Sequence, residues 1–145
     1  MTVLKIERNF PLPPDRVFAF VTRTDNLAKW WGPEGTSLPG HDMDLTRPGA
    51  WCSTMINAEG GRHKVSGVVV VVQPPTLVEF TWGWHNADDL RGHESRVRFE
   101  ISPDGAGGTH FRLIHSALTD AESVANHKMG WTSSLRKLER LATGN

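Results

Sequence analysis

The chain has 145 residues, a length that suits one domain able to bury a core without disulfides or metals. Its 16 basic and 16 acidic side chains cancel, which argues against nucleic acid or an anionic membrane as a partner. The single cysteine, Cys52, excludes an internal disulfide and suits a reducing compartment. No segment resembles a signal peptide, and the longest apolar run, residues 68–72, is too short for membrane insertion. We therefore expect one cytoplasmic domain over residues 1–145.

The first quarter of the chain predicts a strand followed by two short helices. Apolar and polar residues alternate over residues 4–10, which is typical of a half-buried strand, and Pro11 ends it. Pro-Pro-Asp at residues 13–15 then opens a short helix whose apolar side includes Phe20. A second short helix is expected over residues 24–31, where Gly-Pro follows and ends it.

The middle of the chain predicts an antiparallel meander. Stretches of alternating apolar and polar residues are separated by short turns rich in Gly, Pro and Asp, and short turns imply that successive strands pair antiparallel. Such a sheet can keep one face dry while the other is wet. The expected strands are a weak one at residues 38–45, one that contains 51–56, one at 63–73, and three that contain 78–84, 95–101 and 109–115.

Residues 120–143 predict a long helix with Thr119 or Asp120 as its N-cap. Apolar residues recur every three or four positions and form one stripe, and the opposite side is charged, so the helix is expected to lie on an apolar surface. Glycine inside a helix costs about 1 kcal/mol relative to alanine, so we expect Gly130 to mark a close approach to a neighbouring element.

Short motifs follow one another along the chain: Pro14-Asp15-Arg16-Val17-Phe18, Leu27-Ala28-Lys29-Trp30-Trp31-Gly32-Pro33, Arg47-Pro48-Gly49-Ala50-Trp51, Pro74-Pro75 and Gly130-Trp131. In this order and spacing they resemble the activator of Hsp90 ATPase homologue-like family of the START/Bet v 1-like (SRPBCC) superfamily. The resemblance implies an α+β helix-grip fold, in which a curved antiparallel sheet of six or seven strands, two short helices and a long C-terminal helix enclose an apolar cavity. It implies fold better than activity, because the superfamily includes ligand binders, polyketide cyclases and chaperone partners.

Candidate ligand contacts are the large side chains expected to face this cavity, since pockets are lined mainly by apolar and aromatic groups. Trp30 and Trp31 are neighbours on a helix and point about 100° apart, so one is expected to cap the cavity and the other to pack outside it. Trp51 follows a turn and is expected at the rim. A strictly packed core would produce the same pattern. The full set is Phe20, Trp30, Trp31, Trp51, Met55, Phe80, Trp82, Trp84, Phe99, His115, His127 and Trp131.

His115 and His127 are the polar members of this set, placed on otherwise apolar faces. An inward histidine can hydrogen-bond a ligand or act as an acid or base near neutral pH, and it can equally be satisfied by a buried partner. No other catalytic motif is present, and His-Asp-Met-Asp at residues 41–44 is predicted to be a solvated strand edge and no metal site. Cys52 is expected outside the cavity, and a surface position is expected for His63, His85, His93 and His110.

Three functions remain open. The leading hypothesis is binding of a small hydrophobic or aromatic ligand without cofactor or metal. The second is a cavity enzyme of cyclase or dehydratase type, with His115 or His127 as proton carrier. The third is a chaperone-associated interaction module, which the family resemblance implies and which an exposed apolar patch would support. Exposed strand edges and balanced charge are also consistent with a homodimer.

Overall fold

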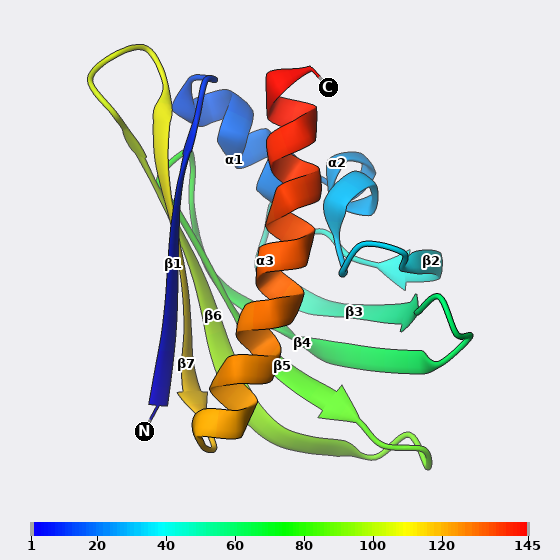
Figure 1. Cartoon of the computed structure of the whole chain (residues 1–145). Helices are drawn as coiled ribbons and strands as arrows, with labels where there is room; N and C mark the ends of the chain where they lie inside the picture. The colour runs from blue at the N-terminus through cyan, green and yellow to red at the C-terminus, as the bar shows by residue number, and fades with distance from the viewer. Residues whose placement is uncertain (1, 145) are drawn as a thin grey trace.

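The computed structural model describes residues 2–144, without the side chains of residues 39–42. A curved sheet of seven strands carries one long helix across its concave face and two short helices near that helix's C-terminal half (Figure 1). In chain order the elements are β1 (Thr2–Phe10), α1 (Pro14–Thr22), α2 (Thr24–Trp30), β2 (Ser37–Asp42), β3 (Gly49–Ile56), β4 (Arg62–Gln73), β5 (Leu77–His85), β6 (Arg91–Pro103), β7 (Thr109–Leu118) and α3 (Ala121–Thr143).

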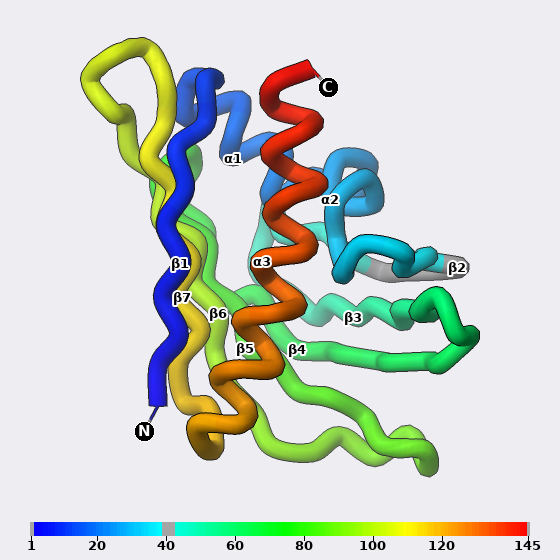
Figure 2. Tube along the Cα trace, in the orientation of Figure 1, coloured from blue at the N-terminus to red at the C-terminus, as the bar shows by residue number. Residues whose placement is uncertain are grey.

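The strand order in the sheet is β1-β7-β6-β5-β4-β3-β2, and every pair is antiparallel. Consecutive strands from β2 to β7 are neighbours, whereas β1 pairs with β7, so β1 and β2 are the two edges. Strand direction turns along the sheet: β1 runs beside α3, and β3 and β4 run across it (Figure 2). This arrangement confirms the predicted helix-grip fold, including its two short helices and its long C-terminal helix.

The ends of α3 follow from capping chemistry. Asp120 is the N-cap, and its side chain accepts a hydrogen bond of 2.8 Å from the backbone N–H of Ser123. Gly144 adopts a left-handed conformation with φ of 79° and closes the C-terminus. Between these ends, Leu135 and Leu138 are fully buried against the sheet and the short helices. The predicted cap and apolar stripe of α3 are therefore confirmed.

One half of the concave face is a filled aromatic core. The rings of Phe80, Phe99 and Phe111 follow one another at centroid separations of 5.4 Å, and Phe10 extends the row at 5.8 Å. Each of these four side chains is at most 2 % exposed. Offset and edge-to-face contacts of this kind leave no space for a ligand among the rings.

Candidate ligand-binding cleft

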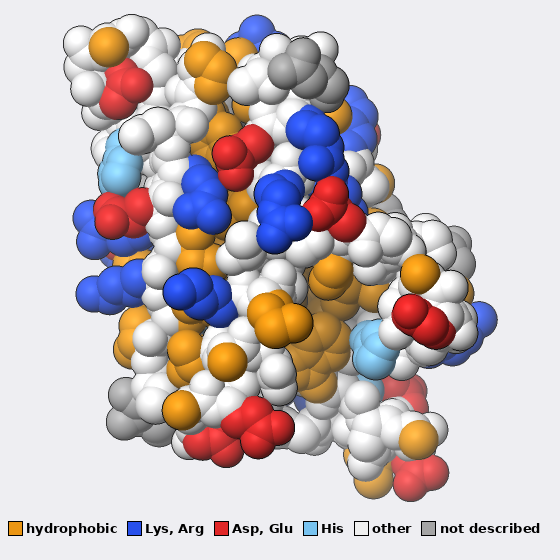
Figure 3. Space-filling view, viewed as in Figure 1, with side chains coloured by type: hydrophobic (Ala, Val, Ile, Leu, Met, Phe, Trp, Pro, Cys, Tyr) orange, Lys and Arg blue, Asp and Glu red, His pale blue; other side chains and the backbone are white. Residues whose placement is uncertain are grey.

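The other half of the concave face opens into a cleft of about 840 Å³ between α3 and the β3–β4 hairpin. Figure 3 shows hydrophobic side chains on the floor of this hollow beside α3, with a histidine at its edge. The lining comes from the segment after α2, the hairpin, β5 and the first half of α3. The residues are Trp31, Gly32, Pro33, Glu34, Thr36, Met55, Asn57, Ala58, Glu59, His63, Trp82, Trp84, Asp120, Glu122, Ser123, Asn126, His127, Gly130, Trp131 and Ser134.

Four indole rings give the cleft its aromatic character. Trp82 is the centre of the group: its ring centroid lies 5.2 Å from that of Trp131, 5.4 Å from that of Trp84 and 5.8 Å from that of Trp31. Trp31 also contacts Trp131 edge to face, at 5.5 Å and 88°. Because each ring packs against another, the indoles hold one another in place and form a firm apolar wall.

The two adjacent tryptophans of α2 are both buried, at 0 % exposure for Trp30 and 2 % for Trp31. Trp31 is the C-cap of α2 and has an extended backbone with φ of −65° and ψ of 136°. The angular spacing of helical neighbours therefore does not apply to this pair, yet one ring lies at the cavity and the other packs outside it, as predicted. Trp31 lines the cleft, whereas Trp30 enters the filled core and donates its indole N–H to the Phe20 carbonyl at 2.8 Å.

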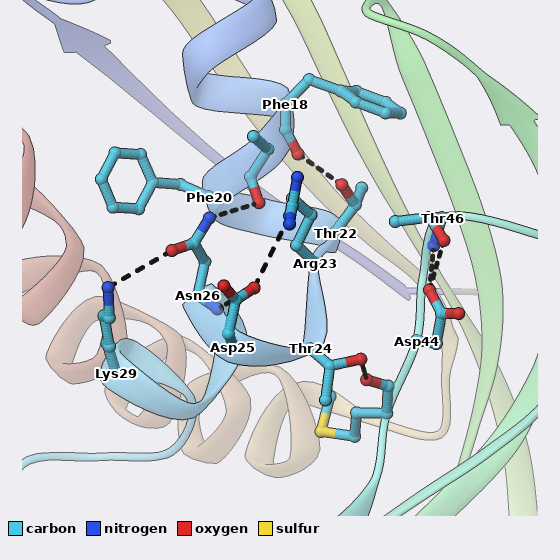
Figure 4. A network of polar contacts seen from close by, with 12 residues as sticks. Phe18, Phe20, Thr22, Arg23, Thr24, Asp25, Asn26, Lys29, Asp44 and Thr46 are labelled. Carbon is cyan, nitrogen blue, oxygen red and sulfur yellow. Dashed lines mark hydrogen bonds and ion pairs between the residues drawn. The ribbon is translucent and has the colours of Figure 1, made fainter.

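Polar contacts tie α2, which precedes Trp31, to its neighbours (Figure 4). The Asn26 side-chain amide donates to the Ala19 carbonyl at 3.1 Å and ties α2 to α1. The Thr24 hydroxyl donates to the Met43 carbonyl at 2.6 Å and ties the start of α2 to the segment after β2. The first turn of α2 is thus bonded both to α1 and to the segment after β2.

Trp51 lies in the core, 2 % exposed, and is absent from the cleft lining, so its predicted position at the rim is wrong. The residue opposite it on β4 is Gly67, which has no side chain. The indole can therefore reach across β4, and its N–H donates to the Thr81 carbonyl on β5 at 3.1 Å. Its ring packs edge to face on Phe80 at 5.4 Å.

The structure divides the twelve predicted contacts into two groups of six. Trp31, Met55, Trp82, Trp84, His127 and Trp131 line the cleft. The six that do not line it are Phe20, Trp30, Trp51, Phe80, Phe99 and His115. Helical periodicity and strand alternation each identify the inward side of an element and give no position along the cavity, so the sequence could not separate the two groups.

The sequence analysis did not predict the polar residues at the rim of the cleft. His63 is exposed as predicted, yet it lines the cleft because it shares the inward parity of the buried Val65 on β4. That parity was visible in the sequence. The hairpin residues Asn57 and Glu59 join it there, and no pattern in a turn sequence identifies which residues will face a cleft.

Gly130 belongs to the cleft wall and does not mark a close helix contact. A Cβ atom at this position would meet only the Cγ atom of Pro33, at 3.9 Å, an ordinary contact distance. The expected tight approach is therefore wrong. The missing side chain keeps open the space between α3 and the segment after α2.

His115 is fully buried behind the cleft and is saturated with hydrogen bonds. Its Nδ1 accepts from the indole N–H of Trp131 at 3.0 Å, and an indole nitrogen can only donate, so the proton of the neutral ring is on Nε2. Nε2 then donates to the Ser95 hydroxyl at 2.7 Å. Burial, with a smaller contribution from His127, lowers the pKa of His115 to about 3. The ring is therefore neutral near pH 7.

His127 repeats this arrangement on α3. Its Nε2 accepts from the indole N–H of Trp84 at 3.0 Å, and its Nδ1 donates to the Ser123 carbonyl at 2.7 Å. Its ring centroid lies 4.6 Å from that of His115. Burial lowers the pKa of His127, partly opposed by the hydrogen bond to Ser123. All four nitrogens of the two histidines are thus occupied, two of them as acceptors for tryptophans.

Glu34 fixes one wall of the cleft. Its carboxylate accepts hydrogen bonds from Arg140 at 2.7 Å and from Arg136 at 3.1 Å, both on α3. The hydrogen bond from Arg140 is the main reason that the pKa of Glu34 lies below its ordinary value. The backbone N–H of Glu34 also donates to the Ser133 hydroxyl at 2.7 Å. These contacts fasten the segment after α2 to the long helix.

A second polar cluster lies on the outer face of the sheet. His85 is on this side of its strand, as predicted, but neighbouring polar groups cover most of it and leave its side chain 12 % exposed. Its Nε2 lies 2.7 Å from the Ser66 hydroxyl, and its Nδ1 lies 2.9 Å from an Asp89 carboxylate oxygen. Arg91 also donates to the Ser66 carbonyl at 2.9 Å, and Lys64 pairs with Asp89 at 3.2 Å. The cluster fastens the β5–β6 hairpin to β4.

Within residues 2–144, leaving aside the side chains of 39–42, no three His, Cys, Asp or Glu side chains form a group that could hold a metal ion. His41 and Asp42 of the segment predicted to be a solvated edge fall among those side chains. Met43 of the same segment is 1 % exposed and belongs to the core, so the prediction is wrong for this residue. None of the helices in the described part of the chain is long and apolar enough to span a membrane.

Sheet, helices and cleft together define a protein of the helix-grip class with a ligand-sized space under its C-terminal helix. Residues 11–143 match the family model described as activator of Hsp90 ATPase homolog 1-like protein, and the chain belongs to this family. The crystal structure of the AHSA1 protein from Silicibacter pomeroyi is 48% identical and has a TM-score of 0.93, with 99% of this chain and 100% of that chain covered.

More distant structures share the fold alone. A protein from Chromobacterium violaceum is 23% identical with a TM-score of 0.85, over 97% of this chain and 96% of that chain. A solution structure from Arthrobacter aurescens is 15% identical with a TM-score of 0.82, over 99% of this chain and 87% of that chain. No curated protein matches the chain.

Proposed function

We propose that the protein binds a small apolar or aromatic molecule in the cleft. The observation that carries this proposal is a space of about 840 Å³ whose wall contains four indole rings. Sites for small molecules typically measure about 300–1,000 Å³ and are lined by apolar and aromatic groups with a few polar ones. Because the cleft is open, its apolar wall faces water when no ligand is bound, and covering that wall would be favourable.

The test uses Gly130, where the chain offers a matched pair of variants. Gly130→Leu places a side chain in the cleft, whereas Gly130→Ala adds one methyl group that has room beside Pro33. Nile red, an uncharged apolar dye, is expected to bind wild type and Gly130→Ala with similar affinity and to bind Gly130→Leu at least about tenfold more weakly, a loss of about 1.4 kcal/mol. Thermal melting checks that both variants are folded. No saturable binding to the wild type would contradict the proposal.

The enzyme hypothesis has less support. A proton carrier needs a ring nitrogen free to reach a substrate and a pKa near the working pH. His115 and His127 use every ring nitrogen for internal hydrogen bonds, and burial lowers the pKa of both. A role as acid or base would require at least one of these bonds to break.

The interaction hypothesis rests on the family description. The large hydrophobic side chains that are exposed on described residues are scattered, and only Val68 and Val70 are close in sequence on one face of a strand. A docking surface for a chaperone would be expected to gather such residues into one patch. We therefore place small-molecule binding first.

A further inference from the structure

The six indole N–H groups of the chain divide into two sets. Four donate to internal acceptors: Trp30 to the Phe20 carbonyl, Trp51 to the Thr81 carbonyl, Trp84 to His127 and Trp131 to His115. The other two, on Trp31 and Trp82, are buried and have no hydrogen-bond partner among the described residues. Both of these tryptophans line the cleft.

Buried donors without an acceptor are uncommon in folded proteins. More than nine in ten buried polar groups are paired, and leaving one unpaired costs about 1–3 kcal/mol. In this chain two histidines, the buried His115 and the half-buried His127, serve as acceptors for two of the cleft indoles. Among the indoles the two exceptions are Trp31 and Trp82, which are 2 % and 5 % exposed and contact each other at a ring separation of 5.8 Å. Elsewhere in the described residues, the Ser53 hydroxyl and the Arg112 Nε are also buried without a hydrogen-bond partner, and neither residue lines the cleft. The two unpaired indoles in the cleft point to an acceptor that arrives with a ligand.

The charge of the cleft selects the kind of acceptor. Four carboxylates are among the lining residues, Glu34, Glu59, Asp120 and Glu122, and the lining includes no lysine or arginine. Glu34 is neutralised by Arg136 and Arg140, whereas Glu59 and Glu122 form no ion pair within the described residues. They stand on opposite walls of the cleft, one on the hairpin and one on α3. An anionic ligand would be repelled from both sides.

On the basis of the binding function proposed above, we infer that the ligand is an uncharged aromatic carbonyl compound whose oxygen accepts a hydrogen bond from the indole N–H of Trp31 or Trp82. The aromatic part packs on the indole wall, and the acidic rim discriminates against carboxylates of the same shape. Aliphatic hydrocarbons can pack on the indole wall, but they leave the N–H groups of Trp31 and Trp82 without an acceptor, so they bind more weakly.

Three probes of matched shape test this inference: 2-acetylnaphthalene, 2-isopropenylnaphthalene, in which a methylene group replaces the carbonyl oxygen, and 2-naphthoate, which carries a negative charge. Titration calorimetry is expected to rank the ketone about three- to tenfold above the alkene, as one net hydrogen bond provides. The carboxylate is expected to bind most weakly. Replacing Glu59 and Glu122 by Gln should raise its affinity severalfold relative to that of the ketone, with Asp88→Asn as a distant charge control.

Indole N–H resonances in nitrogen-15 spectra locate the contact. The resonance of Trp31 or Trp82, assigned with Trp31→Phe and Trp82→Phe, should move downfield with the ketone and not with the alkene. The resonances of Trp30 and Trp51, whose N–H groups already donate to carbonyls, serve as internal controls. Equal affinities of ketone and alkene, or tightest binding by the carboxylate, would overturn the inference and leave the binding function standing. Binding of none of the three would overturn both.

Discussion

The two halves of the concave face are built from the same kinds of side chain and end in opposite states. Phe80 and Phe99 lie in a filled core, and Trp82 and Trp84 lie on an open cleft. Phe80, Trp82 and Trp84 alternate along one strand and therefore share its inner face. What differs is the cover: Trp30 of α2 packs on Phe99, whereas over Trp84 a cleft separates α3 from the β3–β4 hairpin. An aromatic strand face therefore becomes core or binding wall according to the element that lies over it.

The largest expected effect is on stability. Phe99→Ala should lower the free energy of unfolding by about 3–5 kcal/mol, because it empties a site enclosed by other rings. Trp84→Ala removes a larger ring but should cost less, about 1–2 kcal/mol, since that ring is only partly buried and faces the cleft. Urea unfolding followed by circular dichroism measures both. Equal costs would mean that the cleft half is core as well.

The free energy of unfolding should depend on pH because of His115, which lies between the filled core and the cleft. Its pKa is lowered from 6.5 to about 3 in the folded protein, so below pH 6.5 the unfolded state takes up a proton that the folded state refuses. Stability from this group is complete above pH 6.5 and is lost as the pH falls toward 3, with a slope of at most about 1.4 kcal/mol per pH unit.

The matched variant is His115→Asn, whose side-chain oxygen can still accept from the Trp131 indole. It should reduce the slope of unfolding free energy against pH between 6.5 and 4 relative to the wild type. An unchanged slope in His115→Asn would contradict the assignment of a buried neutral ring.

The next largest expected effect is on ligand affinity. Among variants shown to remain folded, Trp131→Ala is expected to weaken Nile red binding about tenfold or more, equivalent to about 1.4 kcal/mol, because it removes a cleft wall. Trp51→Ala should change the affinity less than about threefold, equivalent to about 0.6 kcal/mol, although it too destabilises the fold, since Trp51 lies in the core. An equal loss of Nile red affinity in both variants would contradict the assignment of Trp131 to the cleft and Trp51 to the core.

Most of the architecture could be predicted from the sequence because its determinants are local. Alternation, turn residues and the Asp120 cap each act within a few positions, and the structure confirms the elements that they predict. The division of the aromatic face into core and cleft could not be predicted, because it depends on packing between segments far apart in the chain. The same holds for the histidines: their inward placement was predictable, and their tryptophan partners, Trp131 and Trp84, were not.

The smallest expected effect concerns association. The sheet has two edges, β1 beside the filled half and β2 beside the open half. Unpaired strand edges favour edge-to-edge pairing, and Val3 on β1 is 46% exposed. We expect a homodimer through β1, which would leave the cleft free, so that ligand affinity varies less than about twofold, or about 0.4 kcal/mol, with protein concentration. Light scattering should give the mass of two chains for the wild type and of one chain for Val3→Lys, which places a charge on the edge. A single-chain mass at all concentrations would rule out the dimer, and ligand affinity that falls as dimer forms would place the contact on the β2 side, next to the cleft.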